Sequence, residues 1–362
     1  MAGPIGIVVG TRPEIIKMAP IVRACAERGA PFLLLHTGQH YTFEMDGVFF
    51  RELELPAPHH NLEVGSGSQA YQIGAIVSGM EPILTRERPQ VVLVEGDTNS
   101  VLAAGLAAHK VGLRVGHVEA GLRSYDRSMP EEINRILTDH LADHLFAPTE
   151  RAREILLGEG VANDRIHVTG NTVVDEVLRQ RQRARDPGLL ARFAVEPGRY
   201  ALATVHRAEN VEREERLRGI FTGLAEAGRA LGLPVLAALH PRTANKLDAL
   251  GLAVDGQVRR LPPLGYLEFL GLHAEAALML TDSGGLQEEA CCLRVPCVTL
   301  RDNTERPESV EVGANMLAGA DPGRIVAAAR AMRAHARDWP NPFGDGASGP
   351  RIVDILQKRA GG

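Results

Sequence analysis

The chain has 362 residues, of which 44% are hydrophobic and 23% are charged. That length exceeds one ordinary hydrophobic core, so we expect two domains of a soluble globular protein. A formal net charge of −5 argues against a nucleic-acid-binding protein or a membrane-surface protein. We find neither an apolar run of roughly 20 residues that would span a membrane nor a secretory leader, so a cytoplasmic location is expected.

Short aliphatic runs alternate with longer amphipathic segments along the chain. Strands are expected at residues 5–10, 31–36, 91–95, 115–119 and 145–147, and again at 200–205, 235–240, 277–281 and 295–300. Alternating strands and helices form parallel sheets with helices on both faces, so the predicted fold class is α/β with two Rossmann-like doubly wound domains. Ligands of such domains bind at the carboxyl ends of the strands, which predicts an interdomain cleft.

The alternation pauses between residues 169 and 197, where a charged segment is interrupted by proline and glycine. We therefore place the domain boundary near residue 170. The predicted domains are residues 1–169 and residues 170–346. Residues 347–362 are typical of a helix that follows a glycine-rich loop.

The first polar junction follows the first expected strand. The segment GTRPEIIK places Arg12 and Lys17 around a helix start at Pro13. Both cations would then reach an anion above the helix N-terminus. A capped helix with two surface cations is the alternative interpretation.

Three carboxylates follow strand ends or begin a helix in the first domain. Asp97 comes directly after the strand 91–95, Glu119 ends the strand 115–119, and Glu131 follows Pro130 at a helix start. A helix cap explains Asp97 alone, and a first-turn carboxylate explains Glu131 alone. Together they predict a pocket for acid–base chemistry that also stabilises a sugar cation.

The segment LTDSGGLQEEA, residues 280–290, predicts an anion site in the second domain. Gly284 and Gly285 stand at the start of an expected helix, where glycine allows a ligand to approach the backbone. The first amides of a helix lack intrahelical partners and bind phosphate readily. His206, directly after the strand 200–205, would face the same phosphate when protonated.

Two cofactor signals are weak. The segment GSGSQA at 65–70 matches a dinucleotide-binding pattern, but it does not follow a long buried strand. His140 and His144 have the spacing of zinc ligands, but they lack the H-E-x-x-H pattern and fit a solvated helix face better. We therefore expect neither a nicotinamide cofactor nor a metal.

With these junctions assembled, the chain closely resembles the non-hydrolysing UDP-N-acetylglucosamine 2-epimerases. The segments that carry the resemblance run from residue 10 to residue 308: GTRPEIIKMAP, TGQHY, EGDTNSVLA, GHVEAGLRS, MPEEINR, TGNTVVD, HRAEN, HPRT, TDSGGLQEEA and RDNTERPE. The resemblance implies a glycosyltransferase-B fold whose C-terminal helix, residues 347–362, joins the first domain. It also implies a homodimer that binds a UDP-sugar and needs neither metal nor nicotinamide.

The resemblance also assigns roles to residues at matching motif positions. The catalytic group is Asp97, Glu119, Glu131 and His206. The substrate-binding group is Arg12, Lys17, Phe269, Ser283, Gly284, Gly285, Glu289 and Arg306. Among these, Ser283 to Gly285, Arg12 and His206 match diphosphate contacts, Phe269 a uracil-stacking position, and Glu289 a ribose contact. Met129 departs from the family, since many members carry an aromatic residue there, and this affects the expected sugar specificity.

The chemistry explains this set of residues. The proton on carbon 2 of the sugar is next to an amide nitrogen and is weakly acidic, so epimerisation without a redox cofactor requires loss of UDP to give a glycal. The helix turn and its cations would stabilise the departing diphosphate, and the carboxylates would stabilise the sugar cation and move the proton.

Several alternatives remain at this stage. A 2-epimerase for UDP-2,3-diacetamido-glucuronic acid would use the same motifs and an added cation such as Arg123, Arg127 or Arg135. A hydrolysing epimerase would release N-acetylmannosamine, and a glycosyltransferase would transfer the sugar. An inactive nucleotide-sugar sensor belongs to a different class. Gln39 and His240 match segments of a second, activating substrate site found in some members.

Overall fold

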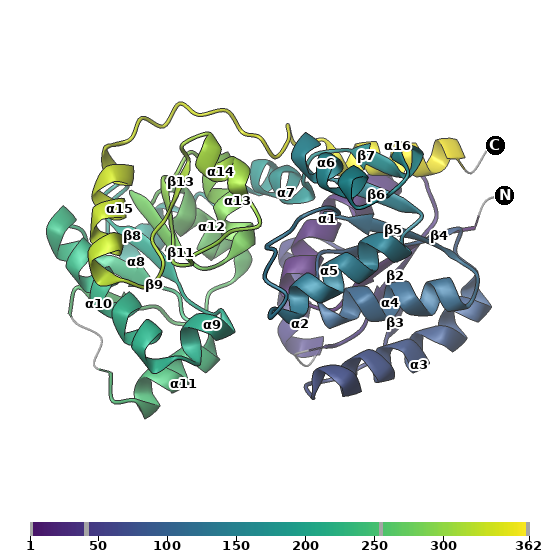
Figure 1. Ribbon diagram of the computed structural model, residues 1–362, viewed down its shortest axis with the longest axis horizontal. Helices are drawn as coiled ribbons and strands as arrows, with labels where there is room; N and C mark the ends of the chain where they lie inside the picture. The colour runs from purple at the N-terminus through teal and green to yellow at the C-terminus, as the bar shows by residue number, and fades with distance from the viewer. Residues whose placement is uncertain (1–2, 40–42, 253–255, 360–362) are drawn as a thin grey trace. The chain divides into compact units, whose positions relative to one another are not determined.

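The computed structural model describes residues 3–39, 43–252 and 256–359 (Figure 1). The chain divides into two compact units, Met1–Glu176 with Phe343–Gly362 (unit 1) and Val177–Pro342 (unit 2). Within the described residues, no helix is long and apolar enough to cross a membrane.

Unit 1 is built on a parallel sheet of seven described strands, in the order β3-β2-β1-β4-β5-β6-β7. In chain order the strands are β1 (Ile5–Val9), β2 (Phe32–His36), β3 (His60–Asn61), β4 (Val91–Glu95), β5 (Arg114–Val118), β6 (His144–Ala147) and β7 (Ile166–Val168). The helices are α1 (Arg12–Glu27), α2 (Phe43–Glu52), α3 (Gln69–Glu87), α4 (Asn99–Lys110), α5 (Pro130–Leu141), α6 (Glu150–Gly158), α7 (Thr172–Gln180), which crosses the unit boundary, and α16 (Ser348–Arg359).

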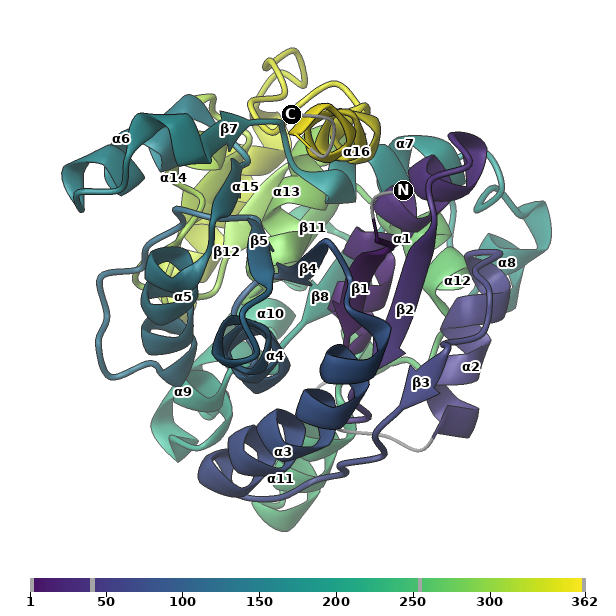
Figure 2. The same cartoon turned by 90° about the vertical axis from the view of Figure 1, so that its right-hand side faces the viewer.

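Helices cover both faces of this sheet (Figure 2). Helices α3, α4 and α5 pack side by side on one face, and α1 packs beside α2 and α16 on the other. The strands β1 and β4 are buried along their whole length, because helices cover both faces of the sheet. Their sequences are therefore runs of mostly aliphatic residues.

Unit 2 is built on a second parallel sheet, whose six described strands have the order β10-β9-β8-β11-β12-β13. The strands are β8 (Ala201–Thr204), β9 (Val235–Ala237), β10 (Val258–Arg260), β11 (Leu278–Thr281), β12 (Cys297–Thr299) and β13 (Asn315–Leu317). The helices are α8 (Pro187–Arg192), α9 (Ala208–Val211), α10 (Glu214–Leu231), α11 (Pro241–Ala249), α12 (Tyr266–Ala274), α13 (Gly284–Leu293), α14 (Pro307–Glu311) and α15 (Pro322–Ala334).

The predicted α/β class with two parallel sheets is confirmed, and each expected strand overlaps an observed one. Four strands were not predicted: β3, β7, β10 and β13. All four stand at the outer ends of the strand orders and are two or three residues long. Edge strands of this length carry too few buried side chains to produce a hydrophobic run.

The last helix completes unit 1 by packing on α1. Asp175 holds its first turn, because the carboxylate accepts hydrogen bonds from the amides of Ser348 (3.0 Å) and Gly349 (2.8 Å). Gly349 lies so close to Pro20 of α1 that a Cβ at this position would be 2.9 Å from the Pro20 Cβ. The two helices therefore meet through a glycine that no larger residue can replace without a shift.

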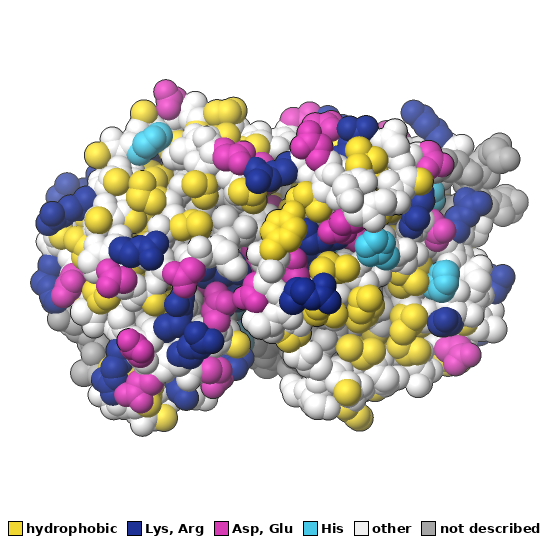
Figure 3. Space-filling view, viewed as in Figure 1, with side chains coloured by type: hydrophobic (Ala, Val, Ile, Leu, Met, Phe, Trp, Pro, Cys, Tyr) yellow, Lys and Arg dark blue, Asp and Glu magenta, His cyan; other side chains and the backbone are white. Residues whose placement is uncertain are grey.

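The surface carries both signs of charge. On the face shown in Figure 3, acidic and basic side chains alternate and form no continuous basic patch. Acidic and basic side chains are therefore intermixed on this face.

Candidate active site

Both sheets carry polar turns at the point where their strand order reverses. In unit 1 this point lies between β1 and β4, so the turns that follow these two strands are neighbours. In unit 2 it lies between β8 and β11. Open α/β sheets bind ligands outside the carboxyl ends of the strands at this switch point. The candidate residues of each unit lie along this edge of its sheet.

Glu14, in the first turn of α1, ties the turns after β1 and β4 together. Its carboxylate accepts hydrogen bonds from the Gly10 amide (2.6 Å), the Thr11 hydroxyl (3.1 Å) and the Thr98 hydroxyl (2.6 Å). Burial raises the pKa of Glu14 to about 7, although these three donors act in the opposite direction. A Cβ at Gly10 would collide with the Ser100 hydroxyl, so this close approach of the turns requires glycine.

Arg12 is the first residue of α1 and is half-buried. Its guanidinium carbon lies 5.0 Å from the centre of the Phe49 ring on α2, within the range of a cation–π contact. The contact holds the cation at the N-terminus of α1. An anion bound there would meet both the helix dipole and the guanidinium.

Lys17 bridges two buried glutamates. Its ammonium nitrogen lies 2.9 Å from Oε1 of Glu95 and also donates to Oε2 of Glu119. Glu95 is the last residue of β4 and Glu119 follows β5, and both are almost fully buried. Glu119 has a φ of +68°, a left-handed conformation that is unusual for a residue with a side chain. Strained backbone of this kind is often found at functional sites, where the surrounding structure holds a side chain in place.

Arg135 on α5 holds the second carboxylate of the site. Its guanidinium binds Asp97 and Glu132 together. Glu132 also accepts hydrogen bonds from the amide of Ser124 (2.9 Å), from its hydroxyl (3.0 Å) and from the amide of Tyr125 (2.9 Å). Glu132 therefore fixes the loop between β5 and α5, while the Asp97 side chain is one-quarter exposed and keeps an open side.

Glu131 differs from its neighbour. It is half-buried at the start of α5, and its side chain makes no hydrogen bond or ion pair within the described residues. Of the two adjacent glutamates, Glu132 spends its carboxylate on contacts within the protein, whereas the carboxylate of Glu131 is available to a ligand. The structure thus separates two carboxylates that the sequence presents as equivalent.

A buried charge network supports the turns that carry Asp97 and Glu119. His117 on β5 places Nδ1 2.6 Å from Asp139 and Nε2 2.8 Å from the carbonyl oxygen of Gly96. The two contacts fix the plane of the ring between the turn after β4 and helix α5. Burial alone would raise the pKa of Asp139, but His117 and Arg123 hold it below its ordinary value.

In unit 2, the helix α13 presents an anion site at its N-terminus. Ser283 is the N-cap residue and its hydroxyl makes no capping hydrogen bond. A Cβ at Gly284 would lie 2.8 Å from the guanidinium carbon of Arg306. A Cβ at Gly285 would meet nothing within 4 Å among the residues that the structure describes outside its own helix. Gly284 thus makes room for an arginine, and Gly285 leaves open space in front of the helix amides. A helix N-terminus beside an arginine is well suited to a phosphate group.

Asp282 anchors His206 beside this turn. The buried carboxylate accepts hydrogen bonds from the amides of His206 and Arg207 and from the side chain of Asn210 (3.0–3.1 Å). The His206 ring also faces it, with Nδ1 3.0 Å from Oδ1. Burial alone would raise the pKa of Asp282, but His206 and these donors lower it. The ring is about half exposed, so its other nitrogen is accessible to a ligand.

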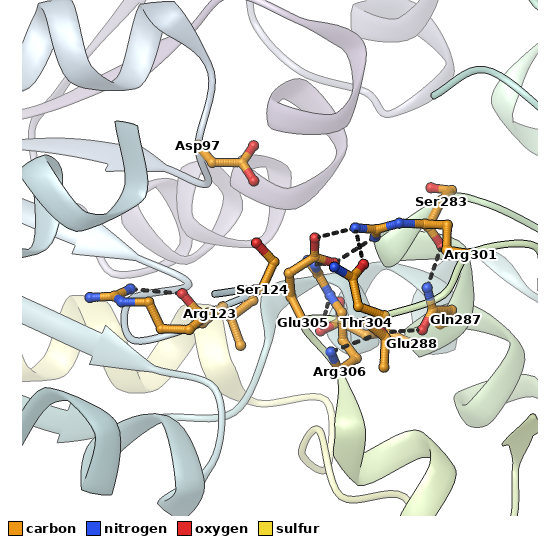
Figure 4. A network of polar contacts seen from close by, with 12 residues as sticks. Asp97, Arg123, Ser124, Ser283, Gln287, Glu288, Arg301, Thr304, Glu305 and Arg306 are labelled. Carbon is orange, nitrogen blue, oxygen red and sulfur yellow. Dashed lines mark hydrogen bonds and ion pairs between the residues drawn. The ribbon is translucent and has the colours of Figure 1, made fainter. Parts of the chain in front are cut away.

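Arg306 belongs to a buried network of ion pairs (Figure 4). Its guanidinium lies 3.3 Å from both Glu288 and Glu305. Glu305 is also held by both terminal nitrogens of Arg301, each at 2.9 Å, and Arg301 reaches Glu209 at 3.0 Å. Burial would raise the pKa of Glu305, but the two arginines hold it well below its ordinary value. The network fixes the loop that presents Arg306 to the N-terminus of α13.

Phe269 and Glu289 lie on either side of His273. The ring centres of Phe269 and His273 are 6.0 Å apart, and Nδ1 of His273 lies 3.7 Å from Oε2 of Glu289. Glu289 and His273 are buried, yet Oε2 of Glu289 and both ring nitrogens of His273 have no hydrogen-bond partner within the described residues. Orphaned buried polar atoms beside an aromatic ring fit a site for a nucleoside, whose hydroxyl groups would satisfy them.

Comparison with known proteins agrees with this geometry. A family model described as UDP-N-acetylglucosamine 2-epimerase matches residues 23–357. The chain belongs to the UDP-N-acetylglucosamine 2-epimerase family. A UDP-N-acetylglucosamine 2-epimerase of Methanocaldococcus jannaschii is 49% identical over 97% of this chain and 98% of the relative.

Solved structures of the family match nearly the whole chain. The M. jannaschii 2-epimerase, solved in complex with UDP-GlcNAc and UDP, has a TM-score of 0.93 and covers 98% of this chain and 99% of the other. The Neisseria meningitidis enzyme, bound to UDP-GlcNAc, has a TM-score of 0.91 at 32% identity, covering 98% and 100%. A UDP-2,3-diacetamido-2,3-dideoxy-D-glucuronate 2-epimerase of Pseudomonas aeruginosa is 40% identical over 97% of this chain and 98% of its own length. The predicted family and enzyme class are therefore confirmed.

The roles of individual residues stay predictions, but the structure brings several of them together. Lys17 and Glu119 are in direct contact, and Arg306 lies against Gly284. Gln39, by contrast, is buried and accepts hydrogen bonds from the amide (3.0 Å) and the hydroxyl (2.6 Å) of Ser100. These contacts give it a structural role in unit 1, whatever regulatory role it has.

His240 caps α11 in unit 2, because its Nδ1 accepts a hydrogen bond from the Arg242 amide. His40 and Tyr41, which complete the TGQHY segment, lie outside the described residues. Within the described chain, no group of three or more His, Cys, Asp or Glu side chains has a metal-binding arrangement.

Proposed function

We propose that the chain catalyses the reversible epimerisation of UDP-N-acetylglucosamine at carbon 2 to UDP-N-acetylmannosamine, by elimination and re-addition of UDP. The observation that carries this proposal is the set of carboxylates Asp97, Glu119 and Glu131 at one sheet edge of unit 1. Asp97 and Glu119 are held in place from behind by Arg135 and Lys17, and Glu131 has no protein partner within the described residues. Carboxylates at a ligand-binding edge fit a reaction that moves a proton beside a sugar cation.

The elimination breaks two bonds of the substrate. A carboxylate removes the proton from carbon 2, the electron pair of that bond forms the double bond between carbons 1 and 2, and the bond from carbon 1 to the diphosphate oxygen breaks. The product is a 2-acetamidoglucal and UDP. Return of a proton to the opposite face of carbon 2, with re-addition of UDP at carbon 1, gives the epimer.

The charges of the two fragments match the two groups of residues. UDP leaves with added negative charge, which the amides of α13, Arg306 and His206 would stabilise through fixed dipoles and charges. The sugar becomes cationic as UDP leaves, and Asp97 and Glu119 would stabilise that charge. The orphaned polar atoms beside Phe269 would receive the nucleoside.

Sugar specificity is the main alternative. A diacetamido-glucuronate substrate carries an additional carboxylate and needs a free cation near the sugar. Arg123 is neutralised by Asp139 and Glu159, and Arg135 is bound to Asp97 and Glu132. Of the three candidate arginines, only Arg127 is exposed without an ion-pair partner in the described chain. Arg123 and Arg135 therefore do not supply the added cation, and the diacetamido-glucuronate alternative depends on Arg127 alone among the three.

Further parts of the proposal come from the family resemblance. The protein acts as a homodimer, and the reaction uses neither metal nor nicotinamide. The cytoplasmic location is a separate part, which follows from the sequence pattern. Gln39 and His240 contribute to a second, activating substrate site. A hyperbolic rate curve without a lag, when UDP-N-acetylmannosamine is the sole substrate, would contradict this activation.

Proton NMR of the purified protein with UDP-N-acetylglucosamine in deuterated buffer tests the reaction. We expect the manno epimer with deuterium at carbon 2 and little free sugar. Free N-acetylmannosamine would identify a hydrolysing enzyme instead. With no reaction, UDP-2,3-diacetamido-glucuronic acid is the next substrate, and inactivity there would leave a nucleotide-sugar sensor. The variant Asp97→Asn serves as the inactive control.

A further inference from the structure

Three buried carboxamide side chains form a chain of hydrogen bonds across unit 1. They are Gln72 in the first turn of α3, Asn99 at the start of α4 and Asn134 on α5, with exposed fractions of 2%, 8% and 6%. The three helices are neighbours on one face of the sheet (Figure 2). The reaction proposed above gives none of these residues a role.

The chain of amides has a fixed direction, because it begins at backbone carbonyls. Nε2 of Gln72 donates to the carbonyl oxygens of Gln39 (2.9 Å) and Gly65 (3.0 Å), which can only accept. The Gln72 oxygen therefore faces Asn99, whose Nδ2 donates to it (2.9 Å). The Asn99 oxygen in turn accepts a hydrogen bond from Nδ2 of Asn134 (3.2 Å). Each amide thus sets the orientation of the next one.

The other end of the chain is Asp97. Nδ2 of Asn134 also donates to the carbonyl oxygen of Asp97 (3.0 Å), so the two N–H groups of this amide have two acceptors. The next residue of the helix, Arg135, binds the Asp97 carboxylate. Helix α5 therefore holds Asp97 at two points, its backbone through Asn134 and its side chain through Arg135.

The same helix carries Glu131. Asn134 and Arg135 follow Glu131 by three and four positions, so the three residues share one face of α5. Because one turn of a helix is rigid, the two contacts with Asp97 also fix the separation between Asp97 and Glu131. Catalysis is sensitive to such distances, since a misplacement of about 1 Å costs about a hundredfold in rate.

We propose that Asn134 is a positioning residue that holds the backbone of Asp97 in place relative to Glu131, and that Asn99 and Gln72 orient its amide. The inference rests on the proposed function, in which Asp97 and Glu131 act on the sugar. Asn134 acts through Asp97, because both N–H groups of its amide are engaged within the protein. Loss of Asn134 removes the contact with Asp97, whereas loss of Asn99 or Gln72 leaves that contact and allows the amide to turn.

The variant Asn134→Leu tests the contact, because leucine keeps the branched shape of asparagine and lacks the donor. We expect kcat to fall about tenfold to a hundredfold. KM and the Kd for UDP should change by less than about twofold, since most of the proposed UDP contacts belong to unit 2. Gln72→Leu should lower kcat by a smaller factor in the wild type and have no further effect in Asn134→Leu. A rise in KM with unchanged kcat would overturn the proposal.

Thr138→Val is the matched control. Thr138 is also fully buried on α5, but its hydroxyl donates to the carbonyl oxygen of Asn134 within the same helix (2.7 Å). This variant loses a buried hydrogen bond of α5 without removing a contact of Asp97, so its kcat and KM should match those of the wild type. If it is slowed as much as Asn134→Leu, any disturbance of the helix slows the reaction and the specific role of Asn134 is wrong.

Asn134→Asp is a second variant of the same size, in case Asn134→Leu does not fold. The new carboxyl group donates to the Asp97 carbonyl only when it is protonated, and burial favours the protonated form. Its kcat relative to that of the wild type should therefore rise as pH falls. A ratio that is the same at every pH would show that the donor to Asp97 does not matter.

Hydrogen exchange measured by mass spectrometry tests the contact without any activity. In Asn134→Leu the peptide that contains Asp97 and Thr98 should exchange faster than in the wild type, whereas Thr138→Val should match the wild type. Unchanged exchange in this peptide overturns the positioning role, and so does a kcat that Asn134→Leu leaves unaffected. If the wild type is inactive and the peptide still exchanges faster in Asn134→Leu, only the proposed reaction is refuted.

Discussion

The glycine pair at the start of α13 allows protein contacts and ligand contacts to be tested separately. A methyl group at Gly284 would press on the Arg306 guanidinium, which is held at 3.3 Å by both Glu288 and Glu305. Beyond its own helix, a methyl group at Gly285 would meet no atom of the described residues within 4 Å. Alanine at this second position should therefore disturb only a bound ligand.

The expected magnitudes follow from these contacts. Gly284→Ala must displace Arg306 and weaken two buried ion pairs, which we expect to cost about 1–3 kcal/mol of stability. Gly285→Ala should leave stability unchanged or raise it by up to about 1 kcal/mol, because alanine is the better helix former. If a diphosphate lies against the Gly285 amide, the methyl group removes about one charge-assisted hydrogen bond. UDP affinity then falls about tenfold to a hundredfold.

Isothermal titration calorimetry with UDP, together with thermal unfolding of the same proteins, measures both effects. The discriminating result is a Gly285→Ala protein that unfolds at or above the wild-type temperature and binds UDP weakly. If Gly285→Ala binds UDP as tightly as the wild type, the diphosphate does not use this helix N-terminus. The assignment of Ser283 to Gly285 would then be wrong, whatever Gly284→Ala does.

Three other variants probe the remaining groups. The raised pKa of Glu14 means that the folded protein binds a proton more tightly than the unfolded chain, so this residue lowers stability as pH rises from about 4.5 to 7. Over that range the free energy of unfolding of Glu14→Gln, measured with urea, should rise by about 1–3 kcal/mol relative to that of the wild type. If the stabilities of the two proteins change in parallel with pH, burial does not raise this pKa. Asp139 has a lowered pKa, so its contribution to stability is present above about pH 4 and is lost as pH falls further. Asp139→Asn should cost about 3–5 kcal/mol at neutral pH, because it removes the carboxylate charge beside His117 and one of the two carboxylates that bind Arg123. A loss below about 1 kcal/mol would show that the network is not coupled. Glu289→Gln should weaken UDP binding about tenfold, while Tm stays the same or rises because a buried oxygen without a partner is removed. If the wild type binds UDP and 2′-deoxy-UDP equally well, Glu289 does not contact the ribose.

The central strands could be predicted because burial on both faces requires aliphatic runs. β4 and β11 show this pattern, and the motifs at their ends therefore fell at the correct edge of each sheet. The edge strands such as β3 and β13 could not be found, because they are two or three residues long and half-exposed. Their positions depend on pairing with β2 and β12 rather than on their own sequence.

The candidate residues were easier to predict than their partners. Glu95 stands at the end of an apolar strand and gave no separate signal, yet it binds Lys17 from a helix 78 positions earlier in the chain. The difference between Glu131 and Glu132 depends on which side of α5 carries Arg135 and faces the preceding loop. His273 lies inside a nine-residue helix whose pattern indicates only a core. Tertiary contacts decide all three cases, and hydrophobic periodicity does not reveal them.

The return of the chain to unit 1 has a consequence for the order of folding. Unit 1 is interrupted by the whole of unit 2 and is completed only by the last helix, where Ile352, Val353 and Leu356 are buried. On a ribosome, unit 2 is fully synthesised while α1 still lacks its covering helix. Domains generally fold as units during synthesis, so the inserted unit is able to mature first, and the unit that begins the chain is the last to close. A nascent chain stalled before residue 343 would therefore carry a folded second unit and an exposed apolar face on α1. Docking of α16 would cover that face and end its exposure to chaperones.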